Sequence, residues 1–209
     1  MVDTYLVIAK EPLPGRVKTR LTPDVTASEA AMLAGAALHD TLDAVAATPA
    51  RNRVLAFDGR VDGWLRPGWR HHPQSDGALD VRLAAAFRCA ADRPALLIGM
   101  DTPQLTPVLL AEFDPDTFDA CLGPTADGGY WCLGLRDPSL ANAVIPGVPM
   151  STPNTFASQH ERLARLGLRV QLLDELVDVD TVADARVVAQ LAPRTAFATT
   201  WTSLTEAAA

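Results

Sequence analysis

Short runs of apolar residues alternate along the chain with longer segments in which apolar residues recur every three or four positions. Residues 5–9 are apolar without interruption, which is typical of a strand covered on both faces. Residues 28–46 are rich in alanine and have helical spacing. The same two patterns predict strands over 5–9, 53–57, 95–99, 118–122, 130–135 and 168–173, and helices over 28–46, 77–91, 106–112, 155–166 and from 181 to about 191.

The order of these segments indicates the fold class. Strands that alternate with helices favour a mostly parallel sheet wrapped by helices, which is an α/β architecture. The loops that follow such strands gather at one edge of the sheet, and ligands bind there, so we expect functional residues directly after strands. Residues 1–192 are expected to form a single domain. Residues 193–209, rich in threonine and alanine, are expected to form a tail that is either a surface segment or disordered.

The composition narrows the class of partner. The chain has 209 residues and a net charge of −7, which disfavours nucleic acid, because binding of nucleic acid depends on basic surface. A nucleotide remains possible where basic residues are concentrated locally or a metal neutralises the phosphates. No apolar run reaches the ~18 residues of a membrane span, and residues 1–10 lack a signal-peptide pattern. The three cysteines, with no C-x-x-C pair, are expected to be reduced, mostly buried thiols of a cytoplasmic protein.

A basic loop follows the first predicted strand. It contains Lys10, Arg16, Lys18 and Arg20, together with Gly15, which allows close approach of a ligand or a positive φ. Lysine and arginine on a strand-to-helix loop can hold phosphate oxygens. The loop is not a P-loop, because it lacks the second glycine and the following Lys-Ser/Thr. The alternative is a solvated basic loop without a ligand.

Acidic residues follow two other strands. Asp101 lies at the end of a buried strand, where a carboxylate is costly unless a hard cation such as Mg²⁺ or another group compensates it. Asp178 and Asp180 alternate on an extended segment, so both could point to one metal ion. The alternatives are that Asp101 caps the next helix, and that Asp180 or Thr181 caps the helix after it.

Two further groups contain residues that could serve a site. Asp127, Gly128 and Gly129 lie between the strands predicted at 118–122 and 130–135, where a tight turn or a plain hairpin fits equally well. His71 and His72 are adjacent, so on a strand they would face opposite ways, and no cysteine or histidine lies at zinc-site spacing. We interpret both histidines as surface or packing residues.

The ordered set of segments 9–21, 99–105, 123–130, 151–152 and 178–181 resembles a family of uncharacterised transferases with the three-layer glycosyltransferase-A (nucleotide-diphospho-sugar transferase, Rossmann-like) fold. Its members are often labelled as glycosyltransferases associated with radical-SAM and selenium proteins. The resemblance covers about residues 4–190. More distantly, the same motif order is similar to the guanylyltransferases that make the phospholactate-type precursor of coenzyme F420, and to molybdenum-cofactor nucleotidyltransferases.

This resemblance implies roles for individual residues, with departures at Asp80, where the family usually has a glycine or another small residue, and at Met150, where it usually has a tryptophan. Within the stretch 74–82, which resembles the family's segment near the base, Gln74 and Gly77 would contact the nucleotide. The loop after the first strand would hold the phosphates, and the aspartates after two other strands would bind Mg²⁺ or Mn²⁺. The implied sets are Lys10, Gly15, Arg16, Lys18 and Arg20 for the nucleotide, Asp101, Asp178 and Asp180 for the metal, and Asp127, Gly128, Gly129, Ser151 and Thr152 for the acceptor.

The leading hypothesis is metal-dependent nucleotidyl transfer, in which a small phosphate- or carboxylate-bearing acceptor reacts with a nucleoside triphosphate and pyrophosphate leaves. Lys18 and Asp101 are the expected catalytic residues. One alternative is glycosyl transfer from a nucleotide sugar, although the position after the mid-chain strand has the lone Asp101 rather than an Asp-x-Asp. The other alternative is a nucleotide-binding protein without catalysis.

Overall fold

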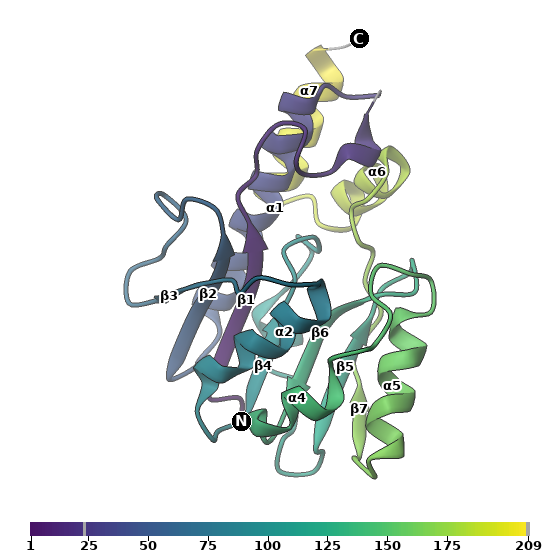
Figure 1. Cartoon of the computed structure of the whole chain (residues 1–209). Coiled ribbons are helices and arrows are strands. Elements are labelled where there is room, and N and C mark those ends of the chain that lie inside the picture. Colours follow the sequence, from purple (N-terminus) through teal and green to yellow (C-terminus); the bar gives the residue numbers. More distant parts are fainter. Residues whose placement is uncertain (23, 208–209) are drawn as a thin grey trace.

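A seven-stranded sheet forms the centre of the computed structural model, which describes residues 1–22 and 24–207 (Figure 1). The strand order is β3-β2-β1-β4-β6-β5-β7. Only β6 runs antiparallel to its neighbours, so the expected mostly parallel α/β sheet is confirmed. The strands are β1 (Thr4–Lys10), β2 (Asn52–Asp58), β3 (Arg70–Pro73), β4 (Ala95–Ile98), β5 (Ala120–Pro124), β6 (Tyr130–Leu135) and β7 (Val170–Leu172).

Helices cover both faces of the sheet. One face packs against α1 (Ala27–Ala47) and α3 (Pro107–Leu110), and the other against α2 (Leu79–Phe87), α4 (Ala141–Val144) and α5 (Thr155–Arg165). Figure 1 shows α2, α4 and α5 together in front of the sheet. Short 3-10 turns complete the chain at η1 (Thr19–Leu21), η2 (Arg88–Ala90) and η3 (Pro138–Leu140). This three-layer arrangement leaves the carboxyl edge of the sheet open between the two helical layers.

Helix α1 begins where its sequence predicts. Thr26 is extended and caps the helix, because its hydroxyl accepts from the amide of Glu29 while the Glu29 carboxylate accepts from the amide of Thr26. One side of α1 packs on the sheet, and the other forms a separate apolar cluster with Leu21, α6 (Val182–Leu191) and α7 (Ala196–Ala207). Leu21, which ends the basic loop, is fully buried in this cluster and so anchors the loop beside α1.

The last part of the described chain is ordered as a packed helix. Phe197 and Trp201 of α7 are buried against α1 and α6, and the Asp40 carboxylate of α1 accepts hydrogen bonds from the amides of Ala196 and Phe197. Residues 196–206, which we expected to be either a surface segment or disordered, therefore form an ordered helix with one side buried and the other exposed. The threonines that suggested a tail satisfy their hydroxyls on carbonyls one turn back, as in Thr200 to Ala196, so their polarity does not prevent a helix.

Strand β3 was not predicted. It forms one edge of the sheet, and its side chains are exposed or half-buried, so it lacks the apolar pattern by which strands are found. His71 is exposed and His72 half-buried, in agreement with the surface or packing role expected for this pair. The predicted helix over 77–91 is also shorter than expected, because α2 spans Leu79–Phe87 and gives way to the 3-10 turn η2.

The structure bears on two further expectations, which concern the cysteines and membrane-spanning helices. Cys121 and Cys132 are buried free thiols and Cys89 is a half-buried one, and burial raises the pKa of Cys132. Within residues 1–22 and 24–207, no helix has both the length and the apolar character required to cross a membrane.

Candidate functional site

The basic loop after β1 directs one lysine into the interior of the site. Lys18 has a left-handed backbone conformation, with φ 47°, and its side chain is 7% exposed. Its ammonium lies 2.5 Å from Asp101 Oδ1, beyond β4, and 3.4 Å from Asp180 Oδ1. Arg20 Nη1 lies 2.9 Å from Asp180 Oδ2. The loop therefore connects to acidic residues from two distant parts of the chain.

Three aspartates converge beside this lysine. One carboxylate oxygen from each of Asp127, Asp178 and Asp180 lies within 4.8 Å of the others. Burial raises the pKa of Asp178 to about 8, and the negative charges of Asp101, Asp180 and Asp127 add to the effect while Lys18 opposes it. Burial and the neighbouring carboxylates therefore make Asp178 costly to ionise, and a cation bound beside it would reduce that cost.

The same carboxylates act on Lys18. Burial alone would lower the pKa of Lys18, because it penalises the charged form. Asp101, Asp178 and, to a smaller extent, Asp180 outweigh burial, and the net pKa of Lys18 is raised. The ammonium therefore stays charged at the centre of the site.

The capping alternatives are decided by the helices that follow. Thr106 caps α3, so Asp101 is not a helix cap. Thr181 caps α6 in a capping box with Asp184. The Asp180 carboxylate is consequently free to contact Lys18 and Arg20.

The turn between β5 and β6 carries Asp127. The hydroxyl of Thr125 (2.6 Å) and the amide of Gly129 (2.9 Å) both donate to Asp127 Oδ1. Gly128 has φ 88° and lies so close to the loop at Pro153 that an added Cβ would be 2.1 Å from the carbonyl oxygen of Pro153. The amide of Phe156 donates to the carbonyl of Gly128 (2.8 Å). These contacts attach the turn to the segment that contains Ser151 and Thr152.

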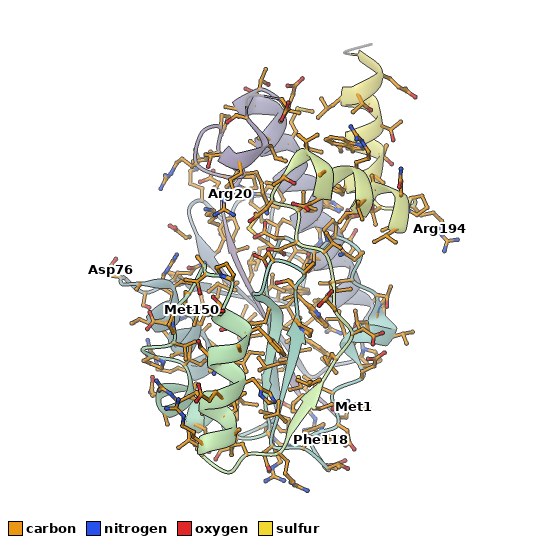
Figure 2. The ribbon with its side chains drawn as sticks, turned by 90° about the vertical axis from the view of Figure 1, so that its right-hand side faces the viewer. Met1, Arg20, Asp76, Phe118, Met150 and Arg194 are labelled. Carbon is orange, nitrogen blue, oxygen red and sulfur yellow. The ribbon has the colours of Figure 1, made fainter. Side chains whose placement is uncertain are left out.

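These residues line one cavity of about 630 Å³ at the carboxyl edge of the sheet. Its volume falls within the ~300–1,000 Å³ usual for small-molecule sites. In Figure 2, Arg20 and Met150 lie above Met1 and Phe118, which precede strands. The residues expected in the site that line the cavity are Lys10, Lys18, Arg20, Gln74, Asp101, Asp127, Gly129, Ser151, Thr152, Asp178 and Asp180.

Four expected site residues lie outside the cavity lining, namely Gly15, Arg16, Gly77 and Gly128. Gly15 and Arg16 are exposed on the basic loop. Gly15 has φ 74°, and a Cβ added there would have no atom within 4 Å. Gly77, with φ 114°, is exposed and packs next to Val81. Gly128 shapes the turn that carries Asp127 and contacts the neighbouring loop through its backbone.

Gln74 lines the cavity, but its side chain is already engaged. Its amide nitrogen donates to the carbonyls of Ala9 (2.7 Å) and Ala56 (3.1 Å), at the ends of β1 and β2, and its oxygen accepts from Arg82 Nη1 (2.9 Å). Arg82 also lines the cavity and was not among the predicted site residues. Arg82 lies one turn after Leu79 in the predicted helix, within the stretch 74–82 that resembles the family's segment near the base. That position is the signal that could have indicated it.

Comparison with solved structures identifies proteins of the same fold. A candidate nucleotide-diphospho-sugar transferase from Desulfovibrio desulfuricans G20 has 30% sequence identity and a TM-score of 0.86, covering 99% of this chain and 95% of that one. CMP:2-keto-3-deoxy-manno-octonic acid synthetase, in complex with CTP, has 13% identity and a TM-score of 0.58 over 92% and 99% of the two chains. Rv0371C from Mycobacterium tuberculosis H37Rv, in complex with manganese, has 18% identity and a TM-score of 0.54 over 91% and 99%.

Sequence comparison gives the family. No curated protein matches the chain. The model of a family described as "Uncharacterized protein conserved in bacteria" matches residues 32–152, which is more than half of the chain and includes Asp101 and Asp127. The chain therefore belongs to this family of bacterial proteins, DUF2064.

Proposed function

We propose that this protein is a metal-dependent nucleotidyltransferase that joins a nucleoside triphosphate to a small phosphate- or carboxylate-bearing acceptor and releases pyrophosphate. The observation that supports this most is the buried Lys18 beside the converging carboxylates in one cavity. The broader class, a nucleotide-dependent transferase, is the class of the proteins that share the fold. The resemblance to phospholactate guanylyltransferases and molybdenum-cofactor nucleotidyltransferases supports the narrower reaction.

The three converging aspartates fit a hard divalent cation. Mg²⁺ and Mn²⁺ take carboxylate oxygens. The raised pKa of Asp178 comes first from burial and then from the neighbouring carboxylates, whose charge a cation would neutralise. Because Asp127 Oδ1 already accepts two hydrogen bonds, its Oδ2 is the oxygen that would face the ion. We propose that Asp127, Asp178 and Asp180 hold the metal. Asp101, a metal ligand by the family resemblance, pairs with Lys18, and we propose that it positions the lysine.

The proposed reaction forms one bond and breaks one. An acceptor oxygen attacks the α-phosphorus, and the bond from that phosphorus to the oxygen bridging to the β-phosphate breaks, so the electron pair leaves with pyrophosphate. Lys18 and Arg20 would donate to phosphate oxygens and stabilise the charge that shifts onto the leaving group. A bound divalent cation would supply further neutralisation of the phosphates.

Residues on the other side of the acidic cluster would bind the acceptor. Ser151 has φ 57°, an unfavourable conformation for a non-glycine residue, and it lines the cavity with Thr152 and Gly129. Strained backbone of this kind is concentrated at binding sites. We propose that these residues contact the acceptor next to the metal, with Asp127 on the border between the two.

A second candidate is glycosyl transfer from a nucleotide sugar. It is favoured by the candidate nucleotide-diphospho-sugar transferase at 30% identity. It is disfavoured by the lone Asp101 after β4, followed by Thr102 and Pro103, where many glycosyltransferases of this fold have Asp-x-Asp. A nucleotide-binding role without catalysis would require that Asp101→Ala leave function in the cell intact.

The deciding experiment measures thermal stability with a panel of nucleoside triphosphates and nucleotide sugars, with and without Mg²⁺. A ligand at 100 times its Kd adds about 2.7 kcal/mol to the folded state. Nucleotidyl transfer is supported if one triphosphate stabilises the protein only with metal, and if Lys18→Ala and Asp101→Ala abolish the effect while Arg60→Ala, on an exposed loop, retains it. Stabilisation by a nucleotide sugar alone would replace it with glycosyl transfer. If a triphosphate stabilises the protein, pyrophosphate release serves as the assay for acceptors.

A further inference from the structure

Arg82 projects from α2 into the cavity. It lies one turn into the helix, and its side chain is 28% exposed. Leu79 and Leu83 of the same helix line the cavity with it. Because α2 packs on the face of the sheet opposite α1, Arg82 enters the cavity from a different layer than Lys18 does.

The guanidinium is held in one orientation by Gln74. The Gln74 amide nitrogen donates to two main-chain carbonyls, so its oxygen has to face the other way, toward Arg82. That oxygen engages Nη1 of Arg82. Arg82 Nε is buried and has no hydrogen-bond partner among the described residues. Because Nε has no surface open to the cavity, the nitrogen that remains for a ligand is Nη2, which is not buried and makes no hydrogen bond among the described residues.

The charge of Arg82 is also poorly compensated. The carboxylate paired with it is Asp58, at 4.0 Å from Nη1, and the side chain of Asp58 is 51% exposed. Lys18 and Arg20, by contrast, lie 2.5 and 2.9 Å from aspartate oxygens. The cavity wall beside Arg82 is apolar, which strengthens any interaction of the guanidinium with an anion. That wall is formed by Ile8, Leu79, Leu83, Leu97 and Tyr130.

We propose that Arg82 is a ligand-binding residue that takes a carboxylate or phosphate group through the N–H groups of its guanidinium that face the cavity, and that Gln74 is its positioning residue. Two oxygens of one such group match the spacing of two parallel N–H donors, which a lysine cannot reproduce. The cavity then has two anion sites, one at Lys18 and the acidic cluster, and one at Arg82. The identity of the ligand rests on the proposed function: the group belongs either to the nucleotide or to the acceptor.

The test is isothermal titration of the full chain with Mg²⁺ present. The probes are pyrophosphate, the nucleoside triphosphates of the stability panel, and phosphoglycolate, a small compound that carries both a phosphate and a carboxylate. The variants are Arg82→Gln, Arg82→Lys and the control Arg88→Gln, an exposed arginine at the other end of α2, outside the cavity. Unfolding midpoints are recorded first, and if Arg82→Gln is not folded, Arg82→Lys decides, because it keeps the charge and loses only the paired donors.

We expect Arg82→Gln to lower the affinity for at least one anionic probe about tenfold or more. Arg82→Lys should lower the same affinity several-fold, and Arg88→Gln should leave it within about twofold of the wild type. A loss confined to the triphosphate places the nucleotide at Arg82, and a loss confined to phosphoglycolate places the acceptor there. Affinities for every probe that are equal in the wild type and the Arg82 variants overturn the inference, as does a wild type that binds no anionic probe. If pyrophosphate or phosphoglycolate binding depends on Arg82 while no triphosphate binds, the inference stands and nucleotidyl transfer fails.

Discussion

The ammonium of Lys18 lies 2.5 Å from Asp101 Oδ1, although the backbone of Lys18 is in the left-handed region at φ 47°. That conformation costs a lysine about 1 kcal/mol, and the chain adopts it because the ion pairs with Asp101 and Asp180 hold the side chain in place. Lys18 therefore occupies the acidic cluster as a built-in cation. The contact couples the phosphate-binding loop to the residues that would hold a metal.

Removing this cation is expected to have opposite effects on two ligands. In Lys18→Gln, Mn²⁺ affinity without nucleotide should rise several-fold, because a competing positive charge has left the carboxylates. Affinity for a nucleoside triphosphate should fall about tenfold or more, because a buried charged donor to phosphate is lost. Electron paramagnetic resonance of free Mn²⁺ measures the first, and titration calorimetry the second. Weaker Mn²⁺ binding in Lys18→Gln, with Arg60→Gln unchanged, would contradict the assignment of Lys18.

Asp127 and Asp101 are expected to have different roles. Asp127→Asn should lower Mn²⁺ affinity by about 10-fold to 100-fold, because a carboxylate of the converging group is lost. Asp101→Asn should change Mn²⁺ affinity less and weaken triphosphate binding more, because Lys18 loses its closest partner. Both variants preserve side-chain volume. A larger loss of Mn²⁺ affinity in Asp101→Asn would restore Asp101 as the principal ligand.

The raised pKa of Asp178 predicts a specific pH dependence of stability. The pKa of Asp178 is about 8 in the folded protein, against an ordinary aspartate value of 3.8. Between these two values the folded state holds a proton that the unfolded state has released. The contribution of Asp178 to stability therefore decreases as pH rises from about 4 to about 8, and levels off above. Urea unfolding of the metal-free protein and of Asp178→Asn should show the wild type losing stability relative to the variant over this interval. If the difference in free energy of unfolding between the wild type and Asp178→Asn stays constant between pH 5 and 9, Asp178 is ionised throughout that range.

The contact between Gly128 and Pro153 can be tested with a matched pair of glycines. Gly128→Ala and Gly15→Ala both place a side chain at positive φ, but only at Gly128 would the new Cβ meet backbone, at 2.1 Å. We expect Gly15→Ala to cost about 1 kcal/mol, from the backbone conformation alone, and Gly128→Ala to cost about 1–3 kcal/mol more. Chemical denaturation measures both. Equal losses would mean that the turn and the loop at 151–155 separate easily.

Much of the fold was predictable because local patterns and tertiary packing agree. The uninterrupted apolar run at 5–9 became β1, which is buried on both faces, and the Thr26 capping box begins α1. Lys18 and Asp101 were predicted to lie at the same edge of the sheet because each follows a strand. The parallel pairing of β1 and β4 places both residues at that edge.

The role of Gln74 shows what local patterns do not contain. The family resemblance implies that Gln74 contacts a nucleotide, and in the structure its amide also joins the ends of β1 and β2 and orients Arg82. The edge strand β3 itself gave no apolar signal, because its pairing with β2 is made by backbone groups that any residue supplies.

From the sequence we could predict six of the seven strands, most helices, the edge of the sheet at which the site forms and the residue types that gather there. These follow from periodicity and from chain connectivity, which are local properties. The three-dimensional structure was required to show which aspartates converge, that Lys18 pairs with Asp101, that Arg82 enters from the opposite layer, and that residues 196–206 pack on α1. These outcomes depend on distances between side chains far apart in the chain, and such distances are set by the packing of whole layers.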